Sequence, residues 1–131
     1  MPKPVTVRDY MSATLVTFTP DTDILAAINQ LITRRISGAP VVDRQGNLVG
    51  VLSEKDCLHA ALQASYHGES AGAVAEYMHG EVKTVDADAN IADVAAMFLR
   101  EDYRRYPVIR ENRLVGQISR RDVLRALEAL W

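Results

Sequence analysis

Two copies of one short motif contain the residues best suited to binding chemistry. The copies are Gly50-Val51-Leu52-Ser53-Glu54-Lys55-Asp56 and Gly116-Gln117-Ile118-Ser119-Arg120-Arg121-Asp122. Each copy runs from a predicted strand into the start of a predicted helix. A helix N-terminus in that position presents free backbone amides and the positive end of the helix dipole, which suits a phosphate. A carboxylate one turn into the helix can accept two hydrogen bonds from a cis-diol such as that of ribose.

The same spacing also fits a structural role for the motif. In a capping box, a Ser at the N-cap and an acidic residue three positions later satisfy each other's backbone amides. The preferred partner at the third helical position of such a box is Glu or Gln, whereas both copies here contain Asp. The choice of Asp favours a shorter carboxylate that is placed for a ligand. Capping and ligand binding do not exclude each other, so both interpretations stay open.

The motif belongs to a repeat that covers almost the whole chain, which is the first feature to test for in a sequence. A shift of 67 residues aligns Val7, Tyr10, Met11, Thr17, Asp21, Ile24 and Pro40-Val41 with Val74, Tyr77, Met78, Thr84, Asp88, Ile91 and Pro107-Val108. One deletion near Gly46 changes the offset to 66, which aligns the two motif copies. We therefore predict two units, residues 1–66 and 67–131, with a polar linker at about residues 65–72.

Both units show the same order of predicted elements, β-α-β-β-α. In the first unit these are a strand at 14–17, a helix from 24, a hairpin of strands 39–42 and 48–52, and a helix from Ser53. In the second unit the hairpin is 106–109 with 114–118. A short helix is expected at 5–10 and at 74–77. The first helices carry apolar faces, formed by Ile24, Ala27, Ile28, Leu31 and Ile32 and by Ile91, Val94, Ala95, Phe98 and Leu99.

Size also constrains the fold. A unit of about 60 residues has a marginal core when it folds alone. We therefore expect an α/β fold in which the two sheets pack face to face and bury apolar surface that neither unit could bury by itself.

This duplicated arrangement, with a Pro-Val strand, a hairpin and a G-x-x-S-x-x-D element in each half, resembles a tandem pair of CBS domains, the Bateman module. The resemblance covers essentially the whole chain. It implies two βαββα units packed sheet to sheet about a pseudo-two-fold axis, with two clefts between the sheets. Members of the family commonly bind AMP, ADP or ATP there, sometimes S-adenosylmethionine, and tend to pair into disc-shaped dimers.

The resemblance also implies roles for particular residues. The implied contacts are to the ribose from Asp56 and Asp122, to the phosphate or ribose from Ser53 and Ser119, to the base side from Thr17 and Thr84, and to the adenine from Ala39 and Tyr106. The two threonines would act largely through backbone groups, and strand propensity alone would also explain them.

The two halves differ in charge close to the motif. Members of the family often place a basic residue two positions before the proline, and Arg105 fits this position whereas the first half has Gly38. Arg120-Arg121 follows Ser119, where the first half has Glu54-Lys55. We expect the cleft around Asp122 to be the more positive one and the better host for a di- or triphosphate, with Arg105 and Arg121 as phosphate ligands. A solvated face or a dimer contact would use the same arginines.

Other residue types exclude several functions. Cys57, His59, His67 and His79 do not form a recognised set of four zinc ligands, so no metal is expected. The single cysteine precludes an internal disulfide, and we expect a buried, inert thiol. There is no Ser-His-Asp grouping, no Walker motif and no G-x-G-x-x-G, so no catalytic residue is assigned.

Charge and hydropathy lead to further exclusions. A net charge of -2 and a pI of about 5.9 argue against a nucleic-acid binder. The apolar stretches are too short for a membrane span, and no signal-like apolar run follows Met1-Pro2-Lys3-Pro4.

The sequence thus predicts a cytoplasmic regulatory module that needs no cofactor, binds an adenine nucleotide and signals energy state to an effector protein. A homodimer is expected through the apolar faces Leu58-Ala61-Leu62 and Leu124-Leu127, with Trp131 packed near the end of the last helix. The alternatives are a structural dimerisation module with empty clefts and an S-adenosylmethionine binder. A nucleotide-hydrolysing enzyme would need a metal or a positioned base, and neither is visible.

Overall fold

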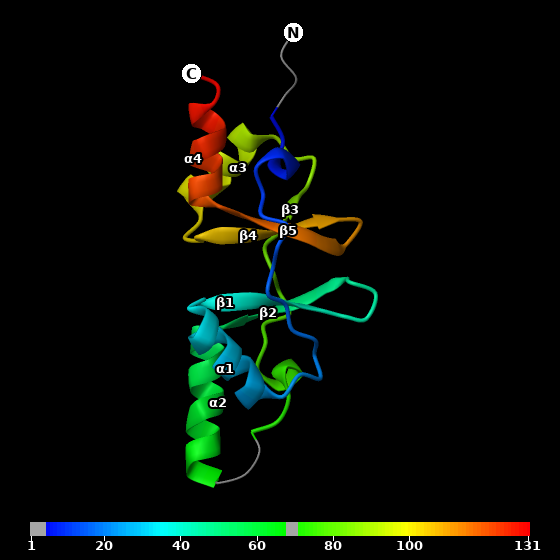
Figure 1. The fold of residues 1–131 in the computed structure, drawn as a ribbon, viewed down its shortest axis with the longest axis vertical. Helices are drawn as coiled ribbons and strands as arrows, with labels where there is room; N and C mark the ends of the chain where they lie inside the picture. Colours follow the sequence, from blue (N-terminus) through cyan, green and yellow to red (C-terminus); the bar gives the residue numbers. More distant parts are fainter. Residues whose placement is uncertain (1–4, 68–70) are drawn as a thin grey trace. The chain divides into compact units, whose positions relative to one another are not determined.

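The computed structural model describes residues 5–67 and 71–131, and the chain divides into two compact units (Figure 1). The continuous unit is Val16–Val82, and the discontinuous unit combines Met1–Leu15 with Lys83–Trp131. Each unit has a sheet, two α-helices and a hydrophobic core of its own. The α/β class predicted from the repeat is therefore confirmed for both halves.

The continuous unit is built on an antiparallel hairpin of β1 (Gly38–Val42) and β2 (Leu48–Ser53). Helices α1 (Ile24–Arg34) and α2 (Glu54–His67) cover one face of this hairpin (Figure 1). Helix α1 begins where the Asp23 carboxylate accepts a hydrogen bond from the amide of Ala26, and it ends at Arg35, which has a left-handed φ of 56°. The buried core comprises Phe18, Ile24, Ala27, Leu31, Ala39, Val41, Leu52, Cys57, Ala60 and Val74.

The discontinuous unit has a three-stranded sheet in the order β3 (Val85–Asp86), β4 (Arg105–Arg110) and β5 (Arg113–Ser119). Strand β3 is parallel to β4, and β5 is antiparallel to it. Helices α3 (Ile91–Arg100) and α4 (Arg120–Glu128) cover one face of this sheet (Figure 1).

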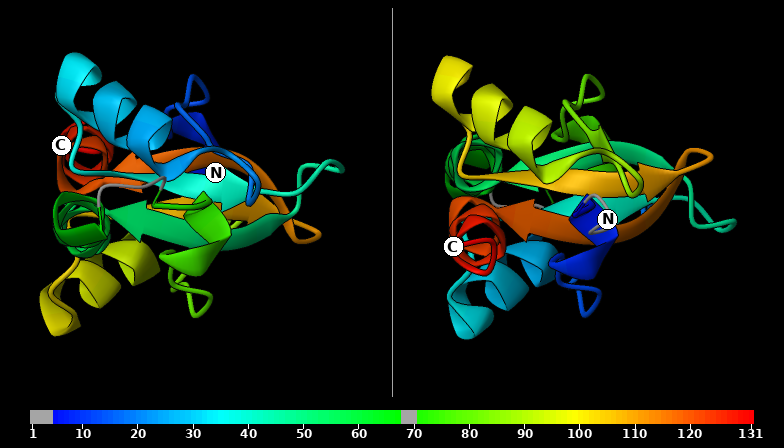
Figure 2. Two further views of the ribbon diagram at one scale, coloured as in Figure 1. Left: turned by 90° about the horizontal axis from the view of Figure 1, so that it is seen from below. Right: turned by 90° about the horizontal axis from the view of Figure 1, so that it is seen from above.

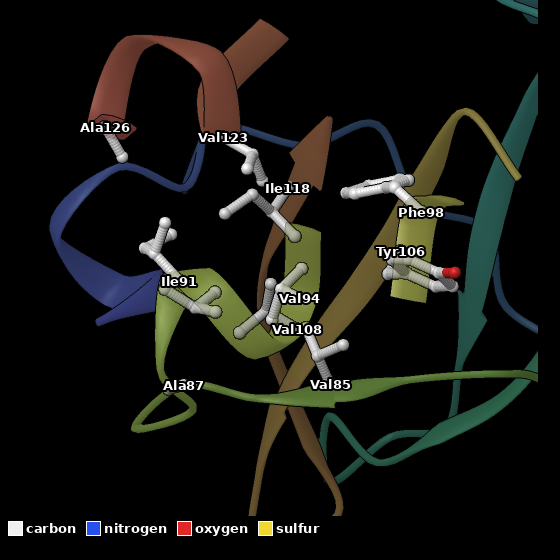
Figure 3. Packing of buried hydrophobic residues seen from close by; sticks show 11 residues of the cluster. Val85, Ala87, Ile91, Val94, Phe98, Tyr106, Val108, Ile118, Val123 and Ala126 are labelled. Atoms are coloured by element: carbon white, nitrogen blue, oxygen red, sulfur yellow. The ribbon is translucent and has the colours of Figure 1, made fainter. Parts of the chain in front are cut away.

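The core of the discontinuous unit is mostly aliphatic, with the aromatic residues Phe98 and Tyr106 together at one side of it (Figure 3). The rings of Phe98 and Tyr106 lie 4.6 Å apart between their centroids, in a tilted arrangement. The buried residues are Val7, Val85, Ala87, Ile91, Val94, Phe98, Tyr106, Val108, Ile118, Val123 and Ala126.

Two short 3-10 helices each contribute one buried valine to a core, and this assigns each helix to a compact unit. Helix η1 (Val7–Asp9) belongs to the discontinuous unit: Val7 is buried there, and its amide donates to the carbonyl of Ala89. Helix η2 (Val74–Glu76) belongs to the continuous unit, where the amide of Val74 donates to the carbonyl of Thr22. Each core therefore takes its short helix from the stretch of chain that precedes the other repeat. The division predicted at residue 66/67 follows the sequence repeat, and the compact units do not.

Several predicted elements differ in extent from the observed ones. The strand expected at 14–17 is absent among the described residues, and pairing is limited to a bridge between Phe18 and Val41. Helix α2 continues to His67, into the stretch predicted as linker, while Gly68, Glu69 and Ser70 lie outside the described residues. Met1-Pro2-Lys3-Pro4, where no signal-like run was expected to begin, also lies outside them.

The predicted apolar helix faces are wider than the buried ones. Ile32 is 70% exposed and Leu99 is 89% exposed, whereas the buried residues are Ile24, Ala27 and Leu31 in α1 and Ile91, Val94 and Phe98 in α3. Helix α4 ends at Glu128, and Trp131 beyond it is 93% exposed among the described residues, so its packing across a dimer contact stays a prediction.

The exchange of short helices leads to a test. Replacing Val7 by Ala removes two buried methyl groups, and we expect a loss of about 2 kcal/mol in the stability of the discontinuous unit. Hydrogen exchange should accelerate at amides of 83–131 and stay unchanged in 16–67. Val74→Ala is the matched variant and should show the reverse pattern. If Val7→Ala instead loosened residues 16–67, the assignment of η1 to the discontinuous unit would be wrong.

Candidate functional site

The two predicted Ser-x-x-Asp motifs both stand at junctions between a strand and a helix. Ser53 is the last residue of β2, immediately before α2, and Ser119 is the last residue of β5, immediately before α4. In each unit the helix start lies at one end of the sheet and the hairpin turn at the other (Figure 2). The motif thus occupies the position that the sequence indicated.

Both carboxylates form capping boxes. Asp56 Oδ2 accepts hydrogen bonds from the amide of Ser53 at 2.8 Å and from its hydroxyl at 2.9 Å, while the Asp56 amide donates back to Ser53 Oγ at 3.2 Å. Asp122 Oδ2 accepts from the amide of Ser119 at 2.9 Å, and its own amide donates to Ser119 Oγ at 3.1 Å. The capping interpretation is therefore confirmed. It uses only part of each carboxylate, so it leaves the ligand interpretation open.

The sheet registers bring other predicted residues to the same end of each sheet. In the discontinuous unit Arg105 pairs directly with Ser119, and Thr84 directly precedes β3, which runs parallel to β4 from Val85 opposite Val108. The continuous unit repeats this arrangement, with Gly38 opposite Ser53 and Thr17 directly before the Phe18–Val41 bridge. The ligand roles of these residues stay predictions.

Positive charge is concentrated on the discontinuous unit. Eleven Lys and Arg residues against nine Asp and Glu give it a net charge of +2, whereas four against eight give the continuous unit -4. Arg105 and Arg121 are exposed, with no ion pair to the described residues. Arg120 is engaged locally, since its Nε donates to the carbonyl of Tyr103 at 3.0 Å.

The side chains of Ala39 and Tyr106, the two residues predicted to flank adenine, are both buried. Tyr106 is fully buried, and its hydroxyl donates to Glu101 Oε1 at 3.1 Å. Burial and this hydrogen bond raise the pKa of Tyr106 to about 12, so the phenol stays neutral. Ala39 is 2% exposed. Stacking of the Tyr106 ring on a ligand is therefore excluded in this conformation, because the ring already packs on Phe98.

The remaining acceptor capacity differs between the two carboxylates. A carboxylate offers about four lone-pair positions. Asp56 uses three: two at Oδ2, and one at Oδ1, which lies 2.8 Å from His79 Nε2. Asp122 uses two, one for Ser119 and one for Arg125 Nη1, which lies 3.0 Å from Oδ1. The Asp56 side chain is 4% exposed and the Asp122 side chain 17% exposed. Asp122 is thus the better equipped of the two to accept both hydroxyls of a cis-diol.

The motif glycines have a structural reason of their own. A Cβ at Gly50 would lie 2.7 Å from the carbonyl oxygen of His79, and a Cβ at Gly116 would lie 2.7 Å from that of Ser12. In both units the segment after the short 3-10 helix runs against the strand backbone, forming the bridges Val51–His79 and Ser12–Gln117. Glycine is needed at these positions because only a residue without a side chain permits that approach.

Among the described residues, Cys57, His59 and His79 belong to no group of side chains that could hold a metal ion. Cys57 is buried, and burial together with the neighbouring carboxylates of Asp56 and Glu54 raises the pKa of its thiol. The expectation of a buried thiol is confirmed. A thiol with a raised pKa is a poor nucleophile, since the thiolate is the reactive form.

Sequence reasoning missed two partners of the carboxylates. Arg125 follows Asp122 at the i, i+3 spacing of neighbours on a helix, and that spacing was a usable signal. His79 lies 23 residues beyond Asp56 in the sequence, and no local pattern connects them. The repeat aligns His79 with Ser12, which gave no indication of contact with an aspartate.

Comparison with known proteins agrees with this architecture. A family model of the CBS domain matches the chain twice, at residues 7–63 and 74–129, so the chain belongs to the CBS domain family as a tandem pair. The chain is 30% identical to CBSX2, a CBS-pair protein of Arabidopsis thaliana solved in complex with AMP, with a TM-score of 0.80 over 95% of this chain and 97% of that one.

Other relatives extend the comparison. The CBS domain pair of protein MJ0100, solved with 5-methylthioadenosine and S-adenosyl-L-methionine, is 25% identical, with a TM-score of 0.73 over 98% of this chain and 100% of that one. An uncharacterized protein of Methanocaldococcus jannaschii, MJ1225, is 30% identical over 125 residues, which are 95% of this chain and 44% of that protein. The chain thus spans less than half of that relative. Within the described residues, no helix has both the length and the apolar character to cross a membrane.

The motif glycines provide a direct test of the docked segments. Gly116→Ala places a methyl group against the carbonyl of Ser12 and Met11 Sδ, so we expect a loss of about 1–3 kcal/mol in a denaturant titration. Gly80→Ala is the matched control, because a Cβ there meets nothing within 4 Å. Equal stabilities of the two variants would contradict the close approach at Gly116.

Proposed function

We propose that this protein is a regulatory module that binds an adenine nucleotide at the starts of α2 and α4 and reports the bound state to an effector protein. The observation that carries the proposal is the duplicated junction, in which a strand-end serine and a helix-start aspartate stand at the start of α2 and again at the start of α4. The AMP complex of CBSX2, at 30% identity over 95% of this chain, supports an adenine ligand. The proposal assigns no catalytic step and requires no cofactor.

The favoured site is the one at Ser119 and Asp122. Its carboxylate keeps two acceptor positions for ribose hydroxyls, and Arg105 stands opposite Ser119 in the sheet register. Arg121 in the first turn of α4 adds a second guanidinium, which can bind phosphate oxygens bidentately. These features favour ADP or ATP over AMP at this site. The Asp56 site has no arginine at the equivalent positions, where Gly38 and Lys55 stand.

Signalling would follow from a shift in conformational population. A ligand changes the balance of two conformations only by the difference in its affinity for them. The proposed contacts connect the end of β5 to the first turn of α4, so the conformation in which strand, helix and arginines converge would be stabilised by the nucleotide. The effector would recognise that conformation. We place the protein in the cytoplasm, where a free thiol such as Cys57 stays reduced.

Isothermal titration with AMP, ADP, ATP and S-adenosylmethionine tests the proposal. Asp122→Ala should remove most nucleotide binding, about 10-fold or more in Kd, because one charged acceptor serves the ribose. Asp56→Ala should have a smaller effect. Thermal melting of both variants separates loss of the cap from loss of the ligand contact. Equal losses would contradict the asymmetry, and no binding of any of the four ligands at millimolar concentration would overturn the proposed function.

We also propose a homodimer, through the groove between α1 and α2. This groove has a volume of about 470 Å³, and seven of the eight residues that line it are apolar or cysteine: Ile28, Leu31, Ile32, Ile36, Cys57, Leu58 and Ala61, with Glu54 as the eighth. Leu58 is 65% exposed and Ile32 is 70% exposed, although both are large apolar side chains. Burial of this surface against a second copy would stabilise the pair.

Sedimentation velocity tests the dimer. Leu58→Glu places a charge in the groove and should give a monomer at concentrations where the unmodified chain is dimeric. Leu25→Glu is the control, because Leu25 is an exposed leucine of α1 that does not line the groove. A dimer that persists in Leu58→Glu would mean that this groove is not the interface.

A further inference from the structure

His79 lies directly on the carboxylate that the proposed function assigns to the ribose in the continuous unit. Its Nε2 is 2.8 Å from Asp56 Oδ1. The imidazole is 62% exposed, whereas the Asp56 side chain is only 4% exposed. One oxygen of this buried carboxylate thus contacts a side chain that is itself exposed to solvent.

The backbone holds His79 in this place. Its amide donates to the carbonyl of Val51 at 3.0 Å, and its carbonyl accepts from the amide of Val51 at 3.0 Å. Gly50 permits this approach, since a side chain there would strike the carbonyl of His79. The reach of the imidazole to Asp56 is therefore fixed by two backbone hydrogen bonds, which any side chain at position 79 would leave intact.

The discontinuous unit has the same backbone contact without the side chain. Ser12, the repeat counterpart of His79, exchanges two hydrogen bonds of 2.9 Å with Gln117. The Ser12 hydroxyl lies 3.4 Å from the carbonyl of Thr14, so it is directed to its own segment. The Asp122 carboxylate is instead contacted by Arg125 from its own helix, and it keeps two acceptor positions.

We propose that His79 weakens ligand binding at the Asp56 site by occupying the acceptor position that a ribose hydroxyl requires. This inference rests on the proposed function and deepens it by naming the residue that makes the two sites unequal. Three of about four acceptor positions on Asp56 are filled, so one is left where a cis-diol needs two. A nucleoside must displace the imidazole to place both hydroxyls on this carboxylate.

Adenosine is the probe for this proposal, because it presents the cis-diol without the phosphate charge that an imidazolium would attract. Binding is followed by the amide resonances of Ser53 and Ser119, which report the two sites separately. Serine is the residue at position 12, the repeat counterpart of His79, so His79→Ser is the test variant. In this variant we expect about tenfold tighter adenosine binding at the Ser53 site, which is the equivalent of one hydrogen bond to a charged acceptor. Binding at the Ser119 site should not change.

Two further variants separate the hydrogen bond from a general structural effect. His79→Gln keeps an N–H donor within reach of Asp56 and should retain weak binding. His59→Ser removes an exposed histidine of α2 three residues after Asp56 and should leave both sites unchanged. Unchanged or weaker adenosine binding at the Ser53 site in His79→Ser would overturn the inference.

The outcomes also distinguish this inference from the proposed function. Adenosine binding at the Ser119 site, together with a Ser53 site that does not respond to His79→Ser, overturns the inference alone. Binding at neither site, in the unmodified chain and in His79→Ser, overturns both. A measurement without ligand checks the contact itself: in Asp56→Asn the ¹⁵N signals of the His79 ring should shift, with the His59 ring as the internal reference. An unchanged His79 signal would also overturn the inference.

Discussion

The close approach of two backbones at Gly50 and Gly116 is the contact on which the rest of each unit depends. At both sites a strand runs against the segment that follows a 3-10 helix, and a side chain on the glycine would hold them apart. The contact anchors that segment, and the 3-10 helix before it places Val7 or Val74 in the core. In the continuous unit it also sets His79 beside Asp56. The same backbone contact thus affects both the packing of each core and the strand that leads to the Ser-x-x-Asp motif.

The two aspartates show how one side chain can serve both stability and binding. A capping box uses one oxygen of the carboxylate and leaves the other available. In the discontinuous unit the second oxygen contacts Arg125, which approaches from the same helix. In the continuous unit the second oxygen contacts His79, which comes from a distant segment. Both repeats therefore have the same helix start, while the residues that contact the two carboxylates differ. The two units also differ in charge, and the unit with the arginine contact is the more positive one.

The sequence predicted most of the fold because its signals are local and occur twice. The hairpins, the four helices and the Ser-x-x-Asp junctions all follow from turn chemistry, helical spacing and capping within a few residues. The compact units do not follow the division at residue 66/67, because the burial of Val7 beside Ala89 is a long-range contact with no local pattern. The same reason explains why His79 was considered only as a metal ligand. Tyr106 lies in the predicted strand, but its ring is buried in the core beside Phe98. Its position before a proline in the sequence does not indicate where the ring points.

The discontinuous unit has a consequence for the order of assembly. Arg8 pairs with Asp88, 80 residues further along the chain, whereas the continuous unit contains no such gap between its parts. During synthesis the first fifteen residues leave the ribosome long before their partners exist, and the continuous unit is complete first. Closing so long a loop also carries an entropic penalty that grows with its length. The buried residue Val7 can therefore reach its core only after residues 83–131 have been synthesised.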